Sequence, residues 1–168
     1  MKNHLTYTLL VAAMLLAGCT SHFYLVRHAE RLDDSADSPL SAAGFARANA
    51  LKDKLINAGI DSVFATPYIR TQQTVVPLAS ALGEPVIIYG TDSTWHFVRG
   101  LKRIWGKNIV VAGHSNTVPD MVRYLTGSTD SIQITHDDYD NLFIVKRQRG
   151  LFRKKMSWIR STYGEPSP

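Results

Sequence analysis

The sequence predicts an α/β fold in which helices cover both faces of a mostly parallel central sheet, a three-layer α/β/α sandwich. Short apolar runs, typical of strands that are buried on both faces, alternate along the chain with longer segments of helical periodicity. Length and composition agree with this prediction. The chain has 168 residues, 45% hydrophobic and 20% charged, which fits one globular domain and excludes a disordered, collagenous or multi-span membrane protein.

The first 18 residues are predicted to be a lipoprotein signal peptide. Lys2 is followed by the apolar run Leu9–Ala17, which is short for a bilayer span, since about 20 residues are needed. The letters LAGC at the end of the run resemble a bacterial lipobox. Cys19 would then be the lipidated N-terminus of a single domain, 19–168. The alternatives are an ordinary secretory signal with a chance cysteine, or a short helix of the fold.

Cysteine count and charge narrow the class of protein further. A single cysteine excludes an internal disulfide framework and a cysteine-clustered zinc site. The net charge of +5 fits attraction to anionic substrates or surfaces. With lipidation at Cys19, we expect a location in the bacterial cell envelope, on the outer side of the inner membrane or in the outer membrane. Nucleic acid is not an expected partner of an exported protein.

The first strand is predicted at Phe23–Val26, and a polar loop follows it. Ser41 is the predicted N-cap of the next helix, which Gly59 ends. The apolar face of this helix repeats every three or four residues: Ala48, Leu51, Leu55 and Ala58. The second strand is predicted at Ser62–Ala65.

Thr66 and Pro67 are predicted to open the second helix, with the proline in its first turn, and Gly83 stops it. Its buried face is predicted from the same periodicity: Val75, Leu78, Ala79 and Leu82. A third strand at Pro85–Tyr89 and a helix at Thr94–Trp105 follow.

The last third of the chain continues the alternation. A fully apolar strand is predicted at Asn108–Ala112, and a helix at Val118–Leu125. Two closing strands are predicted at Asn141–Val145 and Phe152–Ile159, and residues 165–168 are expected to form a loose tail. Strand and helix therefore alternate as a layered α/β sheet requires.

Four cationic or protonatable side chains lie where predicted strands end or helices begin. Arg27 and His28 follow the first strand, and His114 follows the fourth. Arg70 lies in the first turns of the helix after the second strand. Because ligands of open α/β sheets bind outside the carboxyl ends of the strands, we expect these side chains to meet at one crevice. Arginine presents a planar fork of donors that matches phosphate oxygens, so phosphate is the expected ligand.

Two histidines in a phosphate pocket predict covalent catalysis. A neutral imidazole can attack phosphorus and form a phosphohistidine, which divides one difficult step into two easier ones. The second imidazole, when protonated, would stabilise charge on the transferred group beside the arginines. No metal ion or organic cofactor is expected in such a site.

Four motifs, in order along the chain, resemble the histidine phosphatase superfamily, also called the phosphoglycerate mutase-like family. They are LVRHAE from Leu25, PLSAAG from Pro39, ATPYIRTQQT from Ala65 and VVAGHSN from Val110. The resemblance runs from residue 23 to about residue 145. It implies that His28 is the phosphorylated nucleophile, and that the remaining phosphate-pocket residues are Arg27, Arg70 and His114. The short chain is similar to the compact members of the SixA type, which are protein-phosphohistidine phosphatases.

The proton donor to the leaving group is less clearly marked. Mutase-like members of the family place a glutamate after the second arginine motif. Here Glu84 precedes a strand and is expected at the wrong end of the sheet, whereas Asp92 follows that strand and is the predicted general acid. His96 is left open as a site residue. Glu30 is interpreted either as a contact at the pocket rim or as a solvated charge.

Residues 146–160 are strongly basic and contain no acid. One interpretation is a solvated edge hairpin whose charges prevent edge-to-edge pairing. The other is contact with anionic lipid headgroups or lipopolysaccharide phosphates. The basic residues are Lys146, Arg147, Arg149, Arg153, Lys154, Lys155 and Arg160. The acidic segment His136–Asp140 before them is expected to be a loop.

The predicted function is that of a metal-independent phosphomonoester hydrolase that acts through a phosphohistidine. The substrate would be a phosphorylated small molecule or a phosphoprotein, and the membrane would be reached through Cys19. The alternatives are a non-catalytic lipoprotein that binds phosphoanions and, with less support from so short a chain, a phosphomutase. No oligomeric state is predicted.

Overall fold

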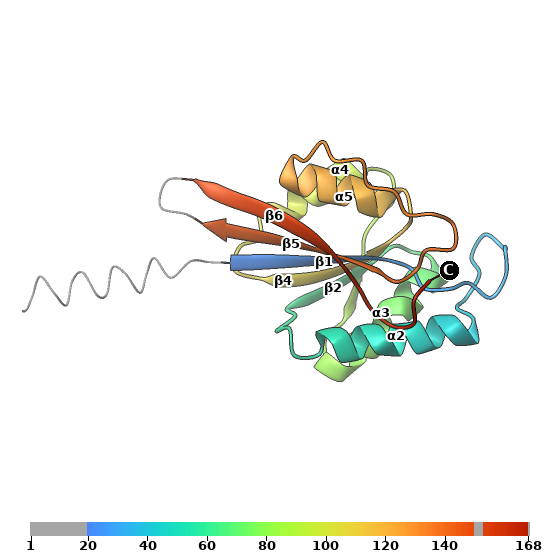
Figure 1. The fold of residues 1–168 in the computed structure, drawn as a ribbon. Coiled ribbons are helices and arrows are strands. Elements are labelled where there is room, and N and C mark those ends of the chain that lie inside the picture. Colours follow the sequence, from blue (N-terminus) through green and yellow to red (C-terminus); the bar gives the residue numbers. More distant parts are fainter. Residues whose placement is uncertain (1–19, 150–152, 168) are drawn as a thin grey trace, which may run out of the picture.

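The computed structural model describes residues 20–149 and 153–167 (Figure 1). The predicted signal peptide and Cys19 lie outside the described residues and remain predictions. The described chain forms one six-stranded sheet in the order β3-β2-β4-β1-β5-β6. The strands are β1 Thr20–Arg27, β2 Ser62–Ala65, β3 Val86–Ile88, β4 Asn108–Gly113, β5 Asn141–Arg149 and β6 Lys154–Thr162. Strands β1 to β4 are mutually parallel, β5 pairs antiparallel with β1, and β6 pairs antiparallel with β5, so the predicted mostly parallel sheet is confirmed.

Two pairs of helices cover the two faces of this sheet, as Figure 1 shows. Helices α2 and α3 lie on one face, and α4 and α5 lie on the other. Their bounds are α2 Ala42–Leu55, α3 Ile69–Leu82, α4 Thr94–Leu101 and α5 Thr117–Thr126. The α/β/α layering predicted from the sequence is therefore confirmed. Within the described residues, no helix has the length and hydropathy needed to cross a bilayer.

The central strands are apolar because both of their faces are covered. In β4, Ile109 and Val111 pack into the core beneath α4 and α5. The alternate residues of the same strand, Val110 and Ala112, pack into the core beneath α2 and α3. Strand side chains point alternately to opposite faces, so a strand between two helical layers needs apolar residues at every position. The edge strand β3 is different, because Ile87 and Ile88 are 41% and 47% exposed.

Three helix boundaries differ from the prediction. Helix α2 ends at Leu55, four residues before Gly59, because Asn108 Nδ2 donates to the carbonyl oxygens of Ala58 and Gly59. These carbonyls are thus drawn toward β4 rather than into a further helical turn.

Helix α3 begins at Ile69, so Pro67 precedes it instead of lying in its first turn. The start is marked by Asp37, whose carboxylate accepts a hydrogen bond from the Ile69 amide at 2.8 Å. Helix α4 ends at Leu101 rather than at residue 105. There Arg147 donates to the carbonyl oxygens of Lys102 and Ile104, which a longer helix would have used internally.

The C-terminal segment is not a loose tail where the structure describes it. The Ser167 hydroxyl accepts hydrogen bonds from the amides of Tyr139 and Asp140, and the Glu165 carbonyl accepts one from Arg47. Residues 165–167 are therefore tied to the loop before β5, close to the end of the sheet where β1 and β4 finish.

Candidate active site

The predicted site is assembled by two adjacent parallel strands that end together. Arg27, the last residue of β1, pairs with Gly113, the last residue of β4, and the His28 amide donates to the Gly113 carbonyl at 2.9 Å. His28 and His114 therefore leave the sheet side by side, and their ring centroids lie 5.5 Å apart. The structure brings both histidines to the carboxyl edge of the sheet, as the sequence predicted.

The ring of His28 is held in one orientation by its own backbone. Its Nδ1 lies 2.8 Å from the carbonyl oxygen of Ala29, and since a carbonyl can only accept, Nδ1 carries the proton. The other nitrogen, Nε2, then has the free lone pair. Burial, together with the charges of Arg27, His114 and Arg70, lowers the pKa of His28 to about 3. His28 is therefore neutral at neutral pH, as a nucleophile must be.

Thr74 ties this arrangement to helix α3. Its hydroxyl accepts a hydrogen bond from the Ala29 amide at 2.9 Å and donates to the Arg70 carbonyl at 2.7 Å. Thr74 is fully buried. It therefore joins the segment that carries His28 to the helix that carries Arg70.

The ring of His114 is positioned from β2 and α5. Its Nε2 lies 3.2 Å from the Thr66 hydroxyl, and its amide donates to the Thr117 hydroxyl at 3.0 Å. The chain turns tightly from the end of β4 into α5. Gly113 permits this turn, because a Cβ on Gly113 would lie 2.9 Å from the Thr117 hydroxyl oxygen. Burial, followed by the charges of Arg70 and Arg27, lowers the pKa of His114 to about 4. The second imidazole is therefore neutral without a ligand; a bound phosphoryl dianion would raise its pKa.

Arg70 lies in the first turn of α3 and is fixed at one terminal nitrogen. Its Nη1 donates to the Ala36 carbonyl at 2.8 Å, and its guanidinium lies 4.4 Å from the centre of the Tyr68 ring. The Tyr68 ring in turn contacts His114 edge-on, with centroids 5.2 Å apart. Within the described residues, Nη2 of Arg70 makes no hydrogen bond, so it is a donor available to an anion.

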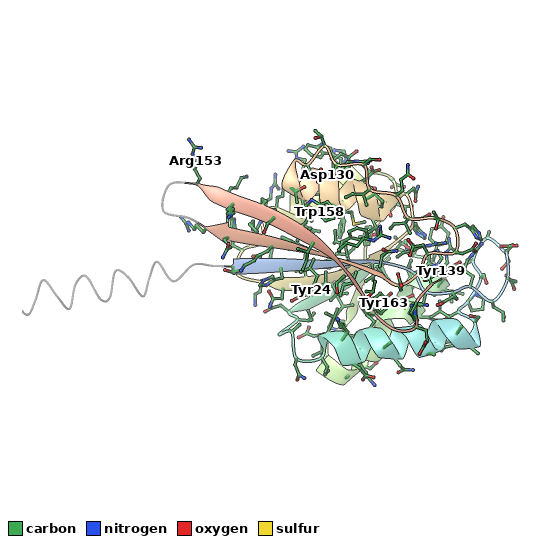
Figure 2. All side chains as sticks on the ribbon, in the orientation of Figure 1. Tyr24, Asp130, Tyr139, Arg153, Trp158 and Tyr163 are labelled. Carbon is green, nitrogen blue, oxygen red and sulfur yellow. The ribbon has the colours of Figure 1, made fainter. Side chains whose placement is uncertain are left out.

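Arg27 also holds the loop before β5, a role that the sequence did not predict. Its Nη1 donates to three carbonyl oxygens of the loop before β5, those of Thr135, His136 and Asp138, at 2.7–3.2 Å. Its guanidinium lies 4.1 Å from the centre of the Tyr139 ring, and that ring lies 6.0 Å from the ring of His28. Figure 2 shows Tyr139 at the end of the sheet opposite Arg153. The acidic segment His136–Asp140, predicted only as a loop, therefore forms one wall of the site.

The comparisons with known proteins agree with this geometry. Residues 23–91 match the family described as "Histidine phosphatase superfamily (branch 1)", and this stretch contains Arg27, His28 and Arg70. His114 lies outside this stretch. The fold of the chain is shared with solved structures over more than four-fifths of its length. Residues 23–91, less than half of the chain, are thus similar to this superfamily.

Individual relatives give the extent of the likeness. The chain is 36% identical over 72 residues to "Probable phosphoglycerate mutase GpmB" of Enterobacter sp. (strain 638), a match that covers 39% of this chain and 34% of that protein. The chain thus matches only about a third of the length of the curated relatives. The solved structure of the protein histidine phosphatase SixA complexed with tungstate has a TM-score of 0.61 at 18% identity, covering 84% of this chain and 96% of that one. A mycobacterial glucosyl-3-phosphoglycerate phosphatase has a TM-score of 0.62 at 11% identity, covering 86% and 98%.

Glu30, the last residue of the LVRHAE motif, is neither a free rim contact nor a solvated charge. Nε of Arg47 donates to both Glu30 carboxylate oxygens at 2.8 and 3.0 Å, and Nη2 donates to one of them at 2.7 Å. The Arg47 side chain is only 5% exposed. Gly44 allows α2 to approach, since a Cβ there would lie 2.3 Å from the Glu30 carbonyl. The ion pair with Arg47 thus holds Glu30 and its motif against α2, and a carboxylate in this ion pair is not available as a proton donor.

Asp92 and His96 lie near one another, outside the group of residues around His28 described above. Both are exposed and line a hollow of about 290 Å³ beside Tyr89. The Tyr89 hydroxyl donates to the carbonyl of Ala112, near the end of β4, so the hollow is at the carboxyl edge of the sheet, as predicted for Asp92. Asp92 has no hydrogen bond or ion pair with any described residue, and its role remains a prediction. Residues 20–149 and 153–167 contain no cluster of three or more potential metal ligands.

The two buried histidines predict how stability depends on pH. Their folded-state pKa values, about 3 and about 4, lie below the ordinary value of 6.5, so the unfolded chain binds protons that the folded chain does not. The free energy of unfolding is therefore expected to decrease, by on the order of a few kcal/mol, as the pH falls from 6.5 to about 4. Urea denaturation across this range measures the effect.

Carboxylates also titrate in this range, so a matched variant isolates the histidines. The double variant His28→Asn/His114→Asn is expected to lose much less stability than the parent over the same interval. The variant His22→Asn is the control, because His22 lies at the other end of β1 and contacts Asn108. An equal loss in the parent and in the double variant would contradict the assignment to His28 and His114.

Proposed function

We propose that the protein hydrolyses phosphomonoesters through a phosphohistidine on Nε2 of His28, without a metal ion. Nε2 attacks phosphorus, the bond to the ester oxygen breaks, and the departing alcohol takes a proton. Water then attacks the phosphohistidine, which releases inorganic phosphate and restores the neutral imidazole. The observation that carries this proposal is the geometry of His28, whose Nδ1 is held by the Ala29 carbonyl and whose ring lies 5.5 Å from that of His114, within the electrostatic influence of Arg27 and Arg70.

The cationic groups of the site supply what the phosphoryl group needs. Arg70 offers its free Nη2, and Arg27 and Arg70 together lower the pKa of both histidines, which places their charge near the reaction. Preorganised donors stabilise the charge that develops on the phosphoryl oxygens. In support of this proposal, the SixA structure with a similar fold is complexed with tungstate, a tetrahedral oxyanion like phosphate. The substrate class remains a phosphorylated small molecule or a phosphoprotein.

A chromogenic assay on the purified full chain tests the proposal. p-Nitrophenyl phosphate is expected to be hydrolysed with release of inorganic phosphate, and an excess of chelator is expected to leave the rate unchanged. A protein that only binds phosphoanions would release neither product. A mutase, as the partly matching Enterobacter relative is named, would transfer the group to an added alcohol in preference to water. Activity that disappears with chelator and returns with a divalent cation would contradict a metal-independent mechanism.

Asp92 is the proposed general acid, and substrates with different leaving groups test its role. An alkoxide is a poor leaving group and needs a proton, whereas p-nitrophenolate does not, and a positioned acid contributes about 10²–10⁴-fold. Asp92→Asn is expected to slow hydrolysis of an alkyl phosphate by about 10²-fold and to spare p-nitrophenyl phosphate. Glu84→Gln is the matched control. Equal effects on the two substrates would remove Asp92 from the mechanism and leave His96, or the substrate itself, as the proton source.

A further inference from the structure

The end of the sheet opposite the site carries an excess of positive charge. Strand β1 starts there and runs about 25 Å to the site, since a strand rises about 3.3 Å per residue. Figure 1 shows the β5–β6 hairpin extending past the start of β1, and Figure 2 shows Arg153 pointing away from the sheet at this end. We call the following group the basic end: Lys102, Arg103, Arg149, Arg153, Lys154 and Lys155.

Apart from Lys146, which is half-buried, the basic residues of the hairpin fall into two classes. Arg147 is buried, with its guanidinium 3.9 Å from the centre of the Trp105 ring, and it donates to the carbonyls of Lys102 and Ile104. Arg160 pairs with Asp138 at 2.8 Å. These two arginines hold the fold together. Arg149, Arg153, Lys154 and Lys155 are exposed, and none of them joins an ion pair with another described residue.

Like charges face one another across this end. Arg149 and Lys154 are directly opposite in the β5–β6 ladder, an arrangement that destabilises a sheet unless an anion lies nearby. After burial, the charge of Lys154 is the second cause that lowers the pKa of Lys102, so the hairpin and the loop after α4 are close enough to repel. The described residues of the hairpin, Asn141–Arg149 and Lys154–Thr162, contain no acid. A polyanionic surface would relieve this repulsion.

Two apolar side chains lie among these charges. Ile104 and Trp105, in the loop after α4, are 36% and 40% exposed. The loop is fastened to the start of β1, because the Gly106 amide donates to the Ser21 hydroxyl at 2.9 Å. Tryptophan combines an apolar ring with a polar N–H and is enriched at membrane interfaces, where cations meet lipid phosphates.

We infer that the basic end docks on an anionic phospholipid bilayer and that it holds the phosphatase site away from the membrane. Charge complementarity, the exposed Trp105 and the position of this end where the described chain begins, after the apolar run Leu9–Ala17, all favour a bilayer over other polyanions. Docking would leave the carboxyl edge of the sheet, with His28 and His114, facing the aqueous phase about 25 Å away. This inference stands independently of the proposed hydrolysis.

Vesicle binding by the full chain tests the inference. Sedimentation is compared between vesicles of phosphatidylcholine alone and vesicles that also contain phosphatidylglycerol. The apolar run is present in every variant, so its contribution cancels in the ratio of the two affinities. The parent is expected to prefer the anionic vesicles, and Lys154→Gln/Lys155→Gln is expected to reduce that preference about tenfold to thirtyfold, since a basic residue near the surface contributes about 1 kcal/mol.

A matched control removes two cations from another face. Lys52→Gln/Lys54→Gln on α2 makes the same change in net charge and is expected to keep at least most of the preference. Thermal unfolding reports whether each variant is folded, and its midpoint is expected to be nearly unchanged by all four substitutions. Equal losses in the two double variants, or no preference in the parent, would overturn the inference. Binding to duplex DNA without binding to anionic vesicles would overturn it as well.

Discussion

Replacing His28 with alanine is expected to abolish hydrolysis, with turnover falling by about 10⁴-fold or more. In the proposed mechanism His28 forms the bond to phosphorus, and no other described side chain is placed to replace it. The ring of His114 lies 5.5 Å away, but its Nε2 is beside the Thr66 hydroxyl. The remaining pocket would still bind phosphate through its arginines, so affinity for inorganic phosphate is expected to change far less than turnover.

Phosphoenzyme trapping identifies the step at which the variant fails. A substrate labelled in its phosphoryl group is expected to leave an acid-labile label on the parent protein, located on His28, and no label on His28→Ala. His22→Ala is the control, because His22 lies near the start of β1, the strand that ends just before His28, and this variant is expected to keep both label and activity. Near-normal turnover in His28→Ala, or a label on another residue, would refute the covalent mechanism.

The sequence predicted the sheet well because its central strands must be apolar on both faces. The runs at Phe23–Val26, Ser62–Ala65 and Asn108–Ala112 lie within β1, β2 and β4. Their parallel order then placed Arg27, His28 and His114 at one edge without any knowledge of side-chain contacts. The meeting of the site residues therefore follows from topology, which periodicity alone predicts.

Long-range polar contacts could not be predicted in the same way. Arg147 and Arg160 belong to a basic run in the sequence, yet one is buried against Trp105 and the other pairs with Asp138. Tyr139 is distant in sequence from His28 and reaches it only through the loop that Arg27 holds. A charged residue is normally exposed, so its burial depends on a partner that local sequence does not reveal. For the same reason, the ion pair of Glu30 with Arg47 could not be predicted from the sequence.

Arg70→Ala and His114→Ala are each expected to lower kcat by about 10²–10³-fold, the usual effect of removing one preorganised charge stabiliser. Each group contacts the transferred phosphoryl group in the proposed mechanism, and each is positioned by the protein before the substrate arrives. Arg70 is fixed by the Ala36 carbonyl and the Tyr68 ring. Arg70→Lys is expected to recover little, because an ammonium ion lacks the planar fork that can bond to Ala36 and to the phosphate at the same time. Arg99→Ala, an exposed arginine on α4, is the matched control.

Whether the loss of activity in these variants falls on kcat or on KM shows how Arg70 and His114 act. An effect confined to KM would mean that they bind substrate and transition state equally, contrary to the proposal. The double variant Arg70→Ala/His114→Ala supplies a second test. Both groups act on the same phosphoryl group, and Arg70 is the largest charge acting on the pKa of His114. Loss of Arg70 raises that pKa and leaves His114 easier to protonate, which partly offsets the missing arginine charge in the single variant. The double variant removes this offset as well, so its loss is expected to exceed the product of the two single losses.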